Sequence, residues 1–187
     1  MTDRLPPVTT DIAGTEQRAL LEQTERKLGR VPNLYAAMAN GPAALRGYLA
    51  LRDALAGGVL GARLREQLAL LIAQENECGY CISAHSMRGG RMGFSDDELA
   101  RTRRAEAEDP HVQAVLTVAR GIVRSGGGVS DELLADVRAA GVTDAELAEI
   151  VAHVALNVLS NYFNQLARPA LDFPAVDPAP PVIAAMS

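Results

Sequence analysis

The stretch ENECGYCISAH, residues 75–85, contains both cysteines of a chain of 187 residues and one of its three histidines. At about 100° per residue, Cys78, Cys81 and His85 fall on one face of a helix. Cysteines three apart in a helical turn can bring their Cα atoms within the roughly 4.4–6.8 Å that a disulfide tolerates. The spacing predicts a dithiol that cycles to a disulfide, with His85 placed to act as a general base for Cys81.

The same stretch is expected to interrupt a longer helical segment. Asn76 is a suitable N-cap, which would put both sulfurs in the first turn, where the helix dipole favours thiolates. Glu66 lies twelve residues before Cys78, about 18 Å and roughly 120° away on a continuous helix. A chain break between residues 76 and 79 would instead bring Glu66 to His85, where a carboxylate fixes the imidazole tautomer.

Other interpretations of these residues stay open. Buried cysteines often serve only as small hydrophobic residues. A zinc site could use Cys78, Cys81 and His85, with His111 or His153 as the fourth ligand, although the chain lacks the compact His-x3–5-His pair that such sites often use. A non-enzymatic redox-sensing or zinc-binding helical module is therefore an alternative to an enzyme. His153, on an apolar segment, is expected to be a satisfied core or interface histidine.

Composition limits the class of protein. The length fits a single domain, expected over residues 1–170, followed by a proline-rich tail at 171–187. Hydrophobic residues make up 48% of the chain, yet no apolar run is long enough to cross a bilayer. The start MTDRLPPVTTDIAG has no secretory pattern, so a cytoplasmic protein is expected. The net charge of −5 disfavours nucleic-acid binding.

Apolar residues recur at helical spacing through most of the chain, which predicts an all-α fold. Helices are expected at 15–28, on both sides of Gly41-Pro42, and at 62–76. Ser95 and Thr143, each three residues before a glutamate, indicate two further helix starts. The last and longest helix is expected from Thr143 to about residue 167. The tail contains too many prolines to be helical throughout.

Two helical segments are apolar around more than one face, LALLIA at 68–73 and EIVAHVALNVL at 149–159. Such helices need neighbours on all sides, more than a chain of this length is expected to supply, so a homo-oligomer is predicted. The tail has more apolar residues than a disordered terminus usually carries, and it is expected to lie extended across a neighbouring subunit or its own domain. These residues are Leu171, Phe173, Val176, Val182 and Ile183.

The segment EQLALLIAQENECGYCISAHSMRGGRMGFSDDEL resembles the core motif of the alkylhydroperoxidase D-like (AhpD-like) branch of the carboxymuconolactone decarboxylase family. That motif has a glutamate, a Cys-x-x-Cys twelve residues later and a histidine four residues after the second cysteine, and Glu66, Cys78, Cys81 and His85 match it. VPNLYAAMANGPAALRGYLALRDAL and NYFNQLARPALDFP resemble flanking segments of peroxidase-related members. One departure is Tyr80, where alkylhydroperoxidase D proteins have a histidine.

The resemblance implies an AhpD-like helical bundle with the Cys-x-x-Cys at a helix N-terminus. It implies a cysteine-based antioxidant peroxidase without metal, haem or other cofactor, in which Cys81 forms the sulfenic acid, Cys78 donates the proton and resolves, and His85 and Glu66 relay protons. The expected partners are a hydroperoxide, an external dithiol or a thioredoxin-like or lipoyl reductant, and copies of the chain in a trimer or hexamer. A carboxymuconolactone decarboxylase-type enzyme is the alternative, although decarboxylation needs no dithiol.

Overall fold

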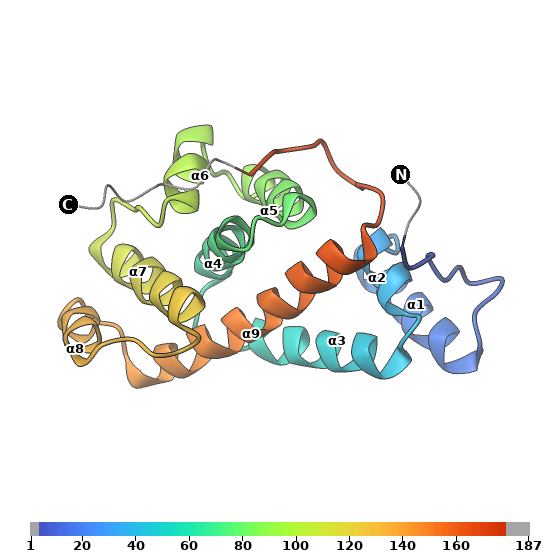
Figure 1. Ribbon diagram of the computed structural model, residues 1–187, viewed down its shortest axis with the longest axis horizontal. Helices are drawn as coiled ribbons and strands as arrows, with labels where there is room; N and C mark the ends of the chain where they lie inside the picture. The colour runs from blue at the N-terminus through green and yellow to red at the C-terminus, as the bar shows by residue number, and fades with distance from the viewer. Residues whose placement is uncertain (1–3, 179–187) are drawn as a thin grey trace.

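The computed structural model describes residues 4–178, and over that range the chain forms nine helices and no strand (Figure 1). This confirms the all-α prediction. None of the helices in this range has the length and apolar character to cross a membrane. The helices are α1 (Thr15–Leu28), α2 (Asn33–Met38), α3 (Pro42–Ala56), α4 (Ala62–Glu75), α5 (Gly79–Arg91), α6 (Asp96–Arg103), α7 (Pro110–Ser125), α8 (Asp131–Ala139) and α9 (Asp144–Ala167).

Side-chain caps start the helices where the sequence predicts them. Thr143 and Glu146 form the reciprocal capping box of α9, with Glu146 N donating to Thr143 Oγ1 at 3.2 Å and Thr143 N donating to Glu146 Oε2 at 2.8 Å. Ser95 accepts from Glu98 N at 3.1 Å at the start of α6. Glu98 does not return a bond, because its carboxylate pairs with Arg63 instead. Local chemistry therefore sets both boundaries.

Helix α4 lies at the centre of the bundle and packs against α5, α6, α7 and α9 (Figure 1). Leu68, Leu71 and Ile72 face the core formed with α7 and α9, whereas Leu70 packs beside the two cysteines. All residues from 68 to 73 are buried. The expectation that the chain lacks enough neighbours for this segment is wrong, because its own helices surround α4.

A tight turn joins α4 to α5 and folds them into a hairpin. Asn76 is the C-cap of α4, Glu77 takes the left-handed conformation with φ 52°, and Cys78 N donates to the Ala73 carbonyl at 2.9 Å. This is the Schellman arrangement that ends many helices. The predicted break is confirmed, but the cap assignment is corrected: Cys78 itself, not Asn76, is the N-cap of α5.

The tail crosses the outside of its own domain. Beyond α9, residues 169–178 run past α5 (Figure 1). The Tyr80 hydroxyl donates to Asp172, Val176 N donates to Ser83 Oγ at 2.8 Å, and Arg103 donates to the Asp177 carbonyl at 2.7 Å. Of the apolar tail residues, Phe173 packs on Tyr80 and Val176 packs beside the cysteines, whereas Leu171 is exposed. Val182 and Ile183 lie outside the described residues.

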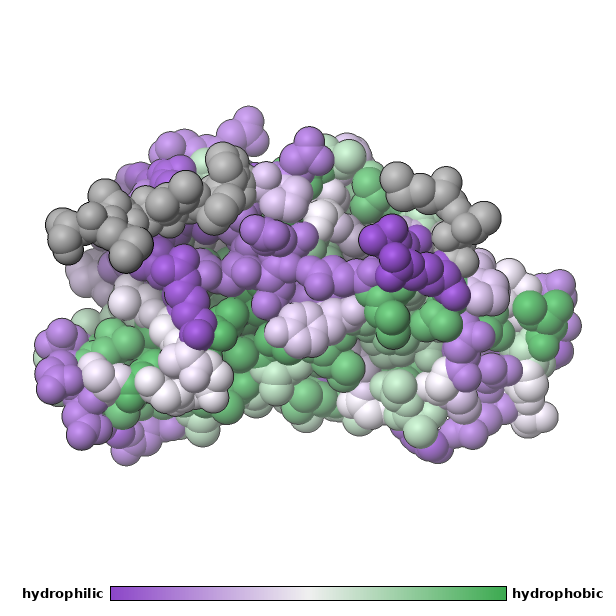
Figure 2. All heavy atoms as spheres, viewed as in Figure 1, coloured by the Kyte–Doolittle hydropathy of each residue, from purple (hydrophilic) through white to green (hydrophobic). Residues whose placement is uncertain are grey.

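Helix α9 leaves an apolar stripe uncovered. Val151, Leu159, Tyr162 and Leu166 are 53%, 43%, 59% and 58% exposed, and their spacing places them along one face of the helix. Figure 2 shows hydrophobic side chains gathered over α9 and α3 on this face of the molecule. Within the described residues, α9 therefore keeps an exposed apolar face that a further copy of the chain could cover, whereas residues 68–73 of α4 are all buried.

Candidate active site

The two cysteines lie in the first turn of α5 and touch each other. Cys78 is the N-cap and Cys81 follows one turn later, with the two Sγ atoms 2.7 Å apart and no disulfide between them. Their exposed fractions are only 2% and 4%. A disulfide requires about 2.05 Å between the sulfurs, so a small side-chain adjustment is enough to form one. The geometry of the pair thus permits a disulfide to form and to be reduced again.

The two sulfurs face different spaces. Cys81 lines a cavity of about 580 Å³, together with His85 and Glu66, and Cys78 does not contribute to it. Cys78 borders a smaller hollow of about 200 Å³, beside Gln165 and Arg168. A molecule bound in the larger cavity therefore meets Cys81, and one that approaches from the tail side meets Cys78.

The thiol environments push the two pKa values in opposite directions. The Cys81 side chain, together with the backbone N–H groups of Cys81 and Tyr80 at the helix start, lowers the pKa of Cys78 despite burial. The contact with Cys78 and burial raise the pKa of Cys81 well above its ordinary value. The first proton therefore leaves the pair with the negative charge centred on Cys78.

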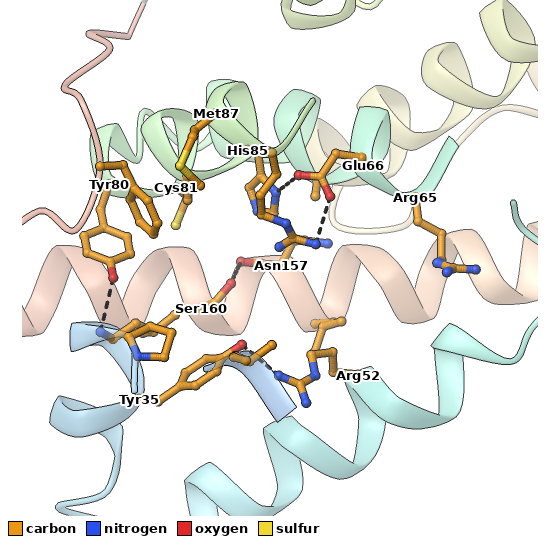
Figure 3. A pocket seen from close by; sticks show the side chains of 18 of the residues that line it. Tyr35, Arg52, Arg65, Glu66, Tyr80, Cys81, His85, Met87, Asn157 and Ser160 are labelled. Atoms are coloured by element: carbon orange, nitrogen blue, oxygen red, sulfur yellow. Dashed lines mark hydrogen bonds and ion pairs between the residues drawn. The ribbon is translucent and has the colours of Figure 1, made fainter. Parts of the chain in front are cut away.

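The α4–α5 hairpin brings Glu66 and His85 together. His85 Nδ1 lies 2.7 Å from Glu66 Oε1, and Arg88 pairs with the other carboxylate oxygen at 3.0 Å. Burial opposes ionisation of Glu66, but the charge and hydrogen bond of His85 and the charge of Arg88 outweigh it and lower the Glu66 pKa. The Nδ1–H of His85 donates a hydrogen bond to the ionised Glu66, which leaves Nε2 as the ring nitrogen that can exchange a proton with the cavity (Figure 3).

Helix α9 adds a polar stripe that the sequence analysis did not identify. His153, Asn157, Ser160 and Asn164 recur at helical spacing, are buried and line the cavity. Asn164 Nδ2 donates to Cys81 Sγ at 3.1 Å, and hydrogen bonds from Asn164 and Asn161 lower the Cys81 pKa against the larger raising effects. The signal was present in the sequence as polar residues at positions i, i+4, i+7 and i+11 of an otherwise apolar helix.

His153 is not the satisfied histidine that the sequence analysis expected. Its side chain is buried with an exposed fraction of 4%, and its Nε2 has no hydrogen-bond partner among the described residues. Burial and then the charge of Arg65 lower its pKa. A neutral imidazole with an unpaired nitrogen therefore stands in the cavity wall.

Tyr80, between the cysteines, is a structural link rather than a third redox group. Its hydroxyl donates to Asp172 of the tail and accepts from Leu34 N at 3.3 Å. Its ring meets Phe173 edge-on, with centroids 5.5 Å apart. Burial and the Asp172 carboxylate raise the Tyr80 pKa, so the phenol stays protonated.

The described residues do not assemble a metal centre. Across residues 4–178, no group of three or more His, Cys, Asp or Glu side chains is arranged to hold a metal ion. Of the two candidate fourth ligands of the zinc hypothesis, His111 pairs with Glu146 at 3.0 Å, whereas His153 lines the same cavity as Cys81 with its Nε2 unpaired. The described residues thus place no complete ligand set around the two cysteines.

Comparisons with known proteins agree with this architecture. Residues 42–124 match the model of the carboxymuconolactone decarboxylase family. No curated protein sequence matches the chain significantly. Among solved structures, the chain is similar to an uncharacterized peroxidase-related protein with an alkylhydroperoxidase AhpD core from Ralstonia eutropha JMP134, with 25% identity, a TM-score of 0.77, and coverage of 90% of this chain and 92% of that one.

Two further structures share the fold at lower identity. A peroxidase-related protein from Silicibacter sp. TM1040 has 20% identity and a TM-score of 0.75, covering 89% of this chain and 88% of that one. A variant of the debrominase Bmp8 in complex with 2,3,4-tribromopyrrole has 18% identity and a TM-score of 0.75, covering 92% and 93%. The chain therefore has the AhpD-like fold, and its residues 42–124 are similar to the carboxymuconolactone decarboxylase family.

Proposed function

We propose that the protein is a thiol-dependent peroxidase that reduces organic hydroperoxides with electrons from an external dithiol. The observation that carries this proposal is the contact between Cys78 and Cys81, with Cys81 facing a cavity that also holds the His85–Glu66 pair. A dithiol supplies two electrons, the number needed to cleave one O–O bond. Half-buried His85, held by buried Glu66, supplies a proton acceptor in the same cavity as Cys81.

The reaction begins with the Cys81 thiolate. After the first ionisation of the pair, one proton remains. Because the sulfurs are in contact, this proton can move from Cys81 to Cys78; alternatively, His85 Nε2 can accept it. The Cys81 thiolate attacks the terminal oxygen of the hydroperoxide, the O–O bond breaks and Cys81 becomes a sulfenic acid. The alkoxide leaving group takes a proton from His85 or Cys78 and departs as an alcohol.

Cys78 then resolves the sulfenic acid. Its thiolate attacks the Cys81 sulfur, forms the disulfide and expels hydroxide, which becomes water on protonation. A thioredoxin-like or lipoyl dithiol in the reducing cytoplasm returns both cysteines to thiols. The net reaction converts a hydroperoxide and a dithiol into an alcohol, water and a disulfide. The lowered Cys78 pKa suits this resolving role.

The first test is steady-state consumption of an alkyl hydroperoxide with a dithiol donor. The wild-type protein should turn over, and Cys81→Ser should abolish turnover because serine forms no sulfenic acid. Ser83→Ala is a matched control, since Ser83 lies on the same helix and bonds the tail through Val176 rather than the cavity. Turnover that persists in Cys81→Ser would remove the peroxidase assignment.

Reductive dehalogenation is a second candidate, because the debrominase Bmp8 shares the fold and was solved with a brominated pyrrole. The same dithiol could replace a carbon–bromine bond with carbon–hydrogen, releasing HBr and leaving the disulfide. Incubation of the reduced protein with 2,3,4-tribromopyrrole distinguishes the two reactions. Bromide release faster than hydroperoxide reduction would favour dehalogenation.

The decarboxylase and the zinc-binding module each have a direct test. Turnover of a muconolactone that survives replacement of both cysteines would favour a decarboxylase. Stoichiometric zinc in protein purified without chelator would favour a zinc-holding module, whereas loss of two free thiols after mild peroxide, without metal, supports the enzyme. The thiol count is the simplest of these measurements.

We also propose that the protein self-associates through the apolar stripe of α9. The four exposed side chains Val151, Leu159, Tyr162 and Leu166 follow one helix face, the pattern that packs against a copy of itself. Light scattering at micromolar concentration should give a multiple of 19.8 kDa. Leu159→Glu should reduce that mass, and a mass near 19.8 kDa for the wild type would contradict self-association.

A further inference from the structure

The charge balance of the larger cavity is opposite to that of the chain. The chain carries a net charge of −5, yet among the described residues six cationic side chains and a single carboxylate, that of Glu66, line the cavity. Cations concentrated in one cavity of an acidic protein attract anions to that site. The six are Lys27, Arg30, Arg52, Arg65, Arg88 and Arg91.

Two of the six cations have no carboxylate partner among the described residues. Arg65 donates to the Leu60 carbonyl at 2.6 Å and forms no ion pair there, and the same range contains no partner for Arg91. The other four are paired: Lys27 with Asp53 at 2.5 Å, Arg52 with Asp53 at 2.8 Å, Arg30 with Asp172 at 3.3 Å and Arg88 with Glu66 at 3.0 Å. Arg65 and Arg91 are therefore the cations available to a ligand.

The unpaired cations lie at the end of the cavity away from the reactive sulfur. Arg91 follows Cys81 by ten residues, about 15 Å along α5. On α9, Asn164 bonds Cys81 and His153 lies eleven residues before it, about 16 Å along that helix. Figure 3 shows Cys81 and Arg65 on opposite sides of the view, with His85 and Glu66 between them. The cavity is therefore elongated, with thiol chemistry at one end and positive charge at the other.

The unpaired nitrogen of His153 lies at the end of the cavity that holds Arg65 and Arg91. Arg65 and His153 line the same cavity, and the charge of Arg65 contributes to the lowered pKa of His153. Glu149 acts on His153 in the opposite sense, but its carboxylate accepts from the backbone N–H groups of Val59 and Leu60 at 2.8 and 3.2 Å. A buried polar atom without a partner is costly, and a ligand oxygen would satisfy it.

Building on the peroxidase assignment, we propose that the substrate is an amphipathic hydroperoxide that also carries a carboxylate. The carboxylate binds Arg65 and His153, with Arg91 at the cavity edge, while the hydroperoxide reaches Cys81 roughly 10–15 Å away. Between these ends the apolar body lies against Tyr35, Met87 and Leu156 of the cavity wall. The volume of about 580 Å³ is of the size that holds small organic ligands.

The test compares linoleic acid hydroperoxide with its methyl ester, which differ only in the charge of the remote group. For the wild type, kcat/KM should favour the acid by at least about tenfold, the scale of one charge-assisted hydrogen bond. Arg65→Gln should collapse the acid-to-ester ratio towards one, mainly through KM for the acid. Arg46→Gln, the same change in an exposed surface pair, should keep the wild-type ratio.

A binding measurement separates failure of this inference from failure of the peroxidase assignment. Calorimetry on Cys81→Ser compares decanoate with decanol, neither of which can react. Tighter binding of decanoate that Arg65→Gln weakens about tenfold supports the carboxylate site, even if no hydroperoxide is turned over. Equal binding of decanoate and decanol, or an acid-to-ester ratio that Arg65→Gln leaves unchanged, overturns it.

Discussion

Cys78 and Cys81 share one helical turn and touch each other, yet their surroundings differ in every respect that matters for chemistry. Cys78 caps α5, has a lowered pKa and borders the tail; Cys81 faces the large cavity, has a raised pKa and accepts a hydrogen bond from Asn164. The asymmetry exists before any substrate binds. The spacing of the Cys-x-x-Cys motif brings the two sulfurs together, whereas the helices packed around it give each sulfur its own pKa and its own access.

The largest expected effect comes from removing Cys78, the proposed resolving thiol. In Cys78→Ser the Cys81 sulfenic acid has no neighbouring thiol to condense with, so steady-state turnover with a protein dithiol donor should be lost. One equivalent of hydroperoxide should still be consumed per chain. Mass spectrometry after dimedone treatment should find the adduct on Cys81. Retained turnover, or no dimedone adduct, would contradict the division of roles between the two sulfurs.

A smaller loss of activity is expected from Glu66→Gln, because Glu66 lies in the cavity that Cys81 faces. The glutamine side chain of this variant can still accept from His85 Nδ1 but carries no charge, so kcat should fall by about a hundredfold. Glu75→Gln, the same change on the same helix, is the control, because Glu75 pairs with Arg124 away from the cavity. Equal rates for the two variants would remove Glu66 from the proton relay.

The Glu66 pair also predicts a pH dependence of stability. The folded-state pKa of Glu66 is lowered, so its carboxylate contributes stability that is fully present above its unfolded pKa of about 4.3 and is lost as pH falls through the folded pKa. The wild-type Tm should therefore decline more steeply below about pH 4 than that of Glu66→Gln. Parallel Tm profiles for the two proteins would contradict this linkage.

The sequence predicted the parts of this site that depend on local spacing. The spacing of Cys78, Cys81 and His85 was enough to place them on one helix face, whereas the contact of Glu66 with His85 needed a helix break that the spacing permits and the family resemblance favoured. Asn164 and Arg65 could not be assigned in this way, because their roles depend on how α9 and α4 pack around one cavity. Asn76 was misassigned because asparagine suits either end of a helix, and only the backbone shows which helix it caps.

Asn164→Ala should weaken the thiolate at Cys81 while leaving Cys78 as it is. Loss of the 3.1 Å hydrogen bond removes one of the interactions that lower the Cys81 pKa, so kcat/KM near neutral pH should fall about tenfold and its pH profile should move to higher pH. Asn157→Ala is the matched control on α9, because Asn157 donates to the His153 carbonyl rather than to sulfur. A pH profile shared by both variants would exclude Asn164 as the group that stabilises the thiolate.

The smallest expected effect concerns Cys78, which packs beside the tail. Asp172 of the tail accepts from the Tyr80 hydroxyl, from Asn33 N at 2.9 Å and from Arg30 at 3.3 Å. Tyr80→Phe removes the first of these bonds and the bond from Leu34 N to the hydroxyl, and it keeps the aromatic ring on Phe173. The free energy of unfolding should therefore fall by about 2 kcal/mol, the scale of one hydrogen bond to a charged acceptor and one weaker neutral bond.

The same substitution should act unequally on the two thiols. Val176 and the hollow beside Leu171 adjoin Cys78, so a loosened tail exposes Cys78 first, whereas Cys81 is reached from the large cavity on the other side. Iodoacetamide labelling followed by mass spectrometry should show faster modification of Cys78 in Tyr80→Phe, with a smaller change at Cys81. Tyr162→Phe, an identical change at an exposed position, should leave both labelling rates unaltered. If Tyr80→Phe accelerated the labelling of both thiols equally, the tail would stabilise the fold as a whole rather than specifically shield Cys78 from solvent.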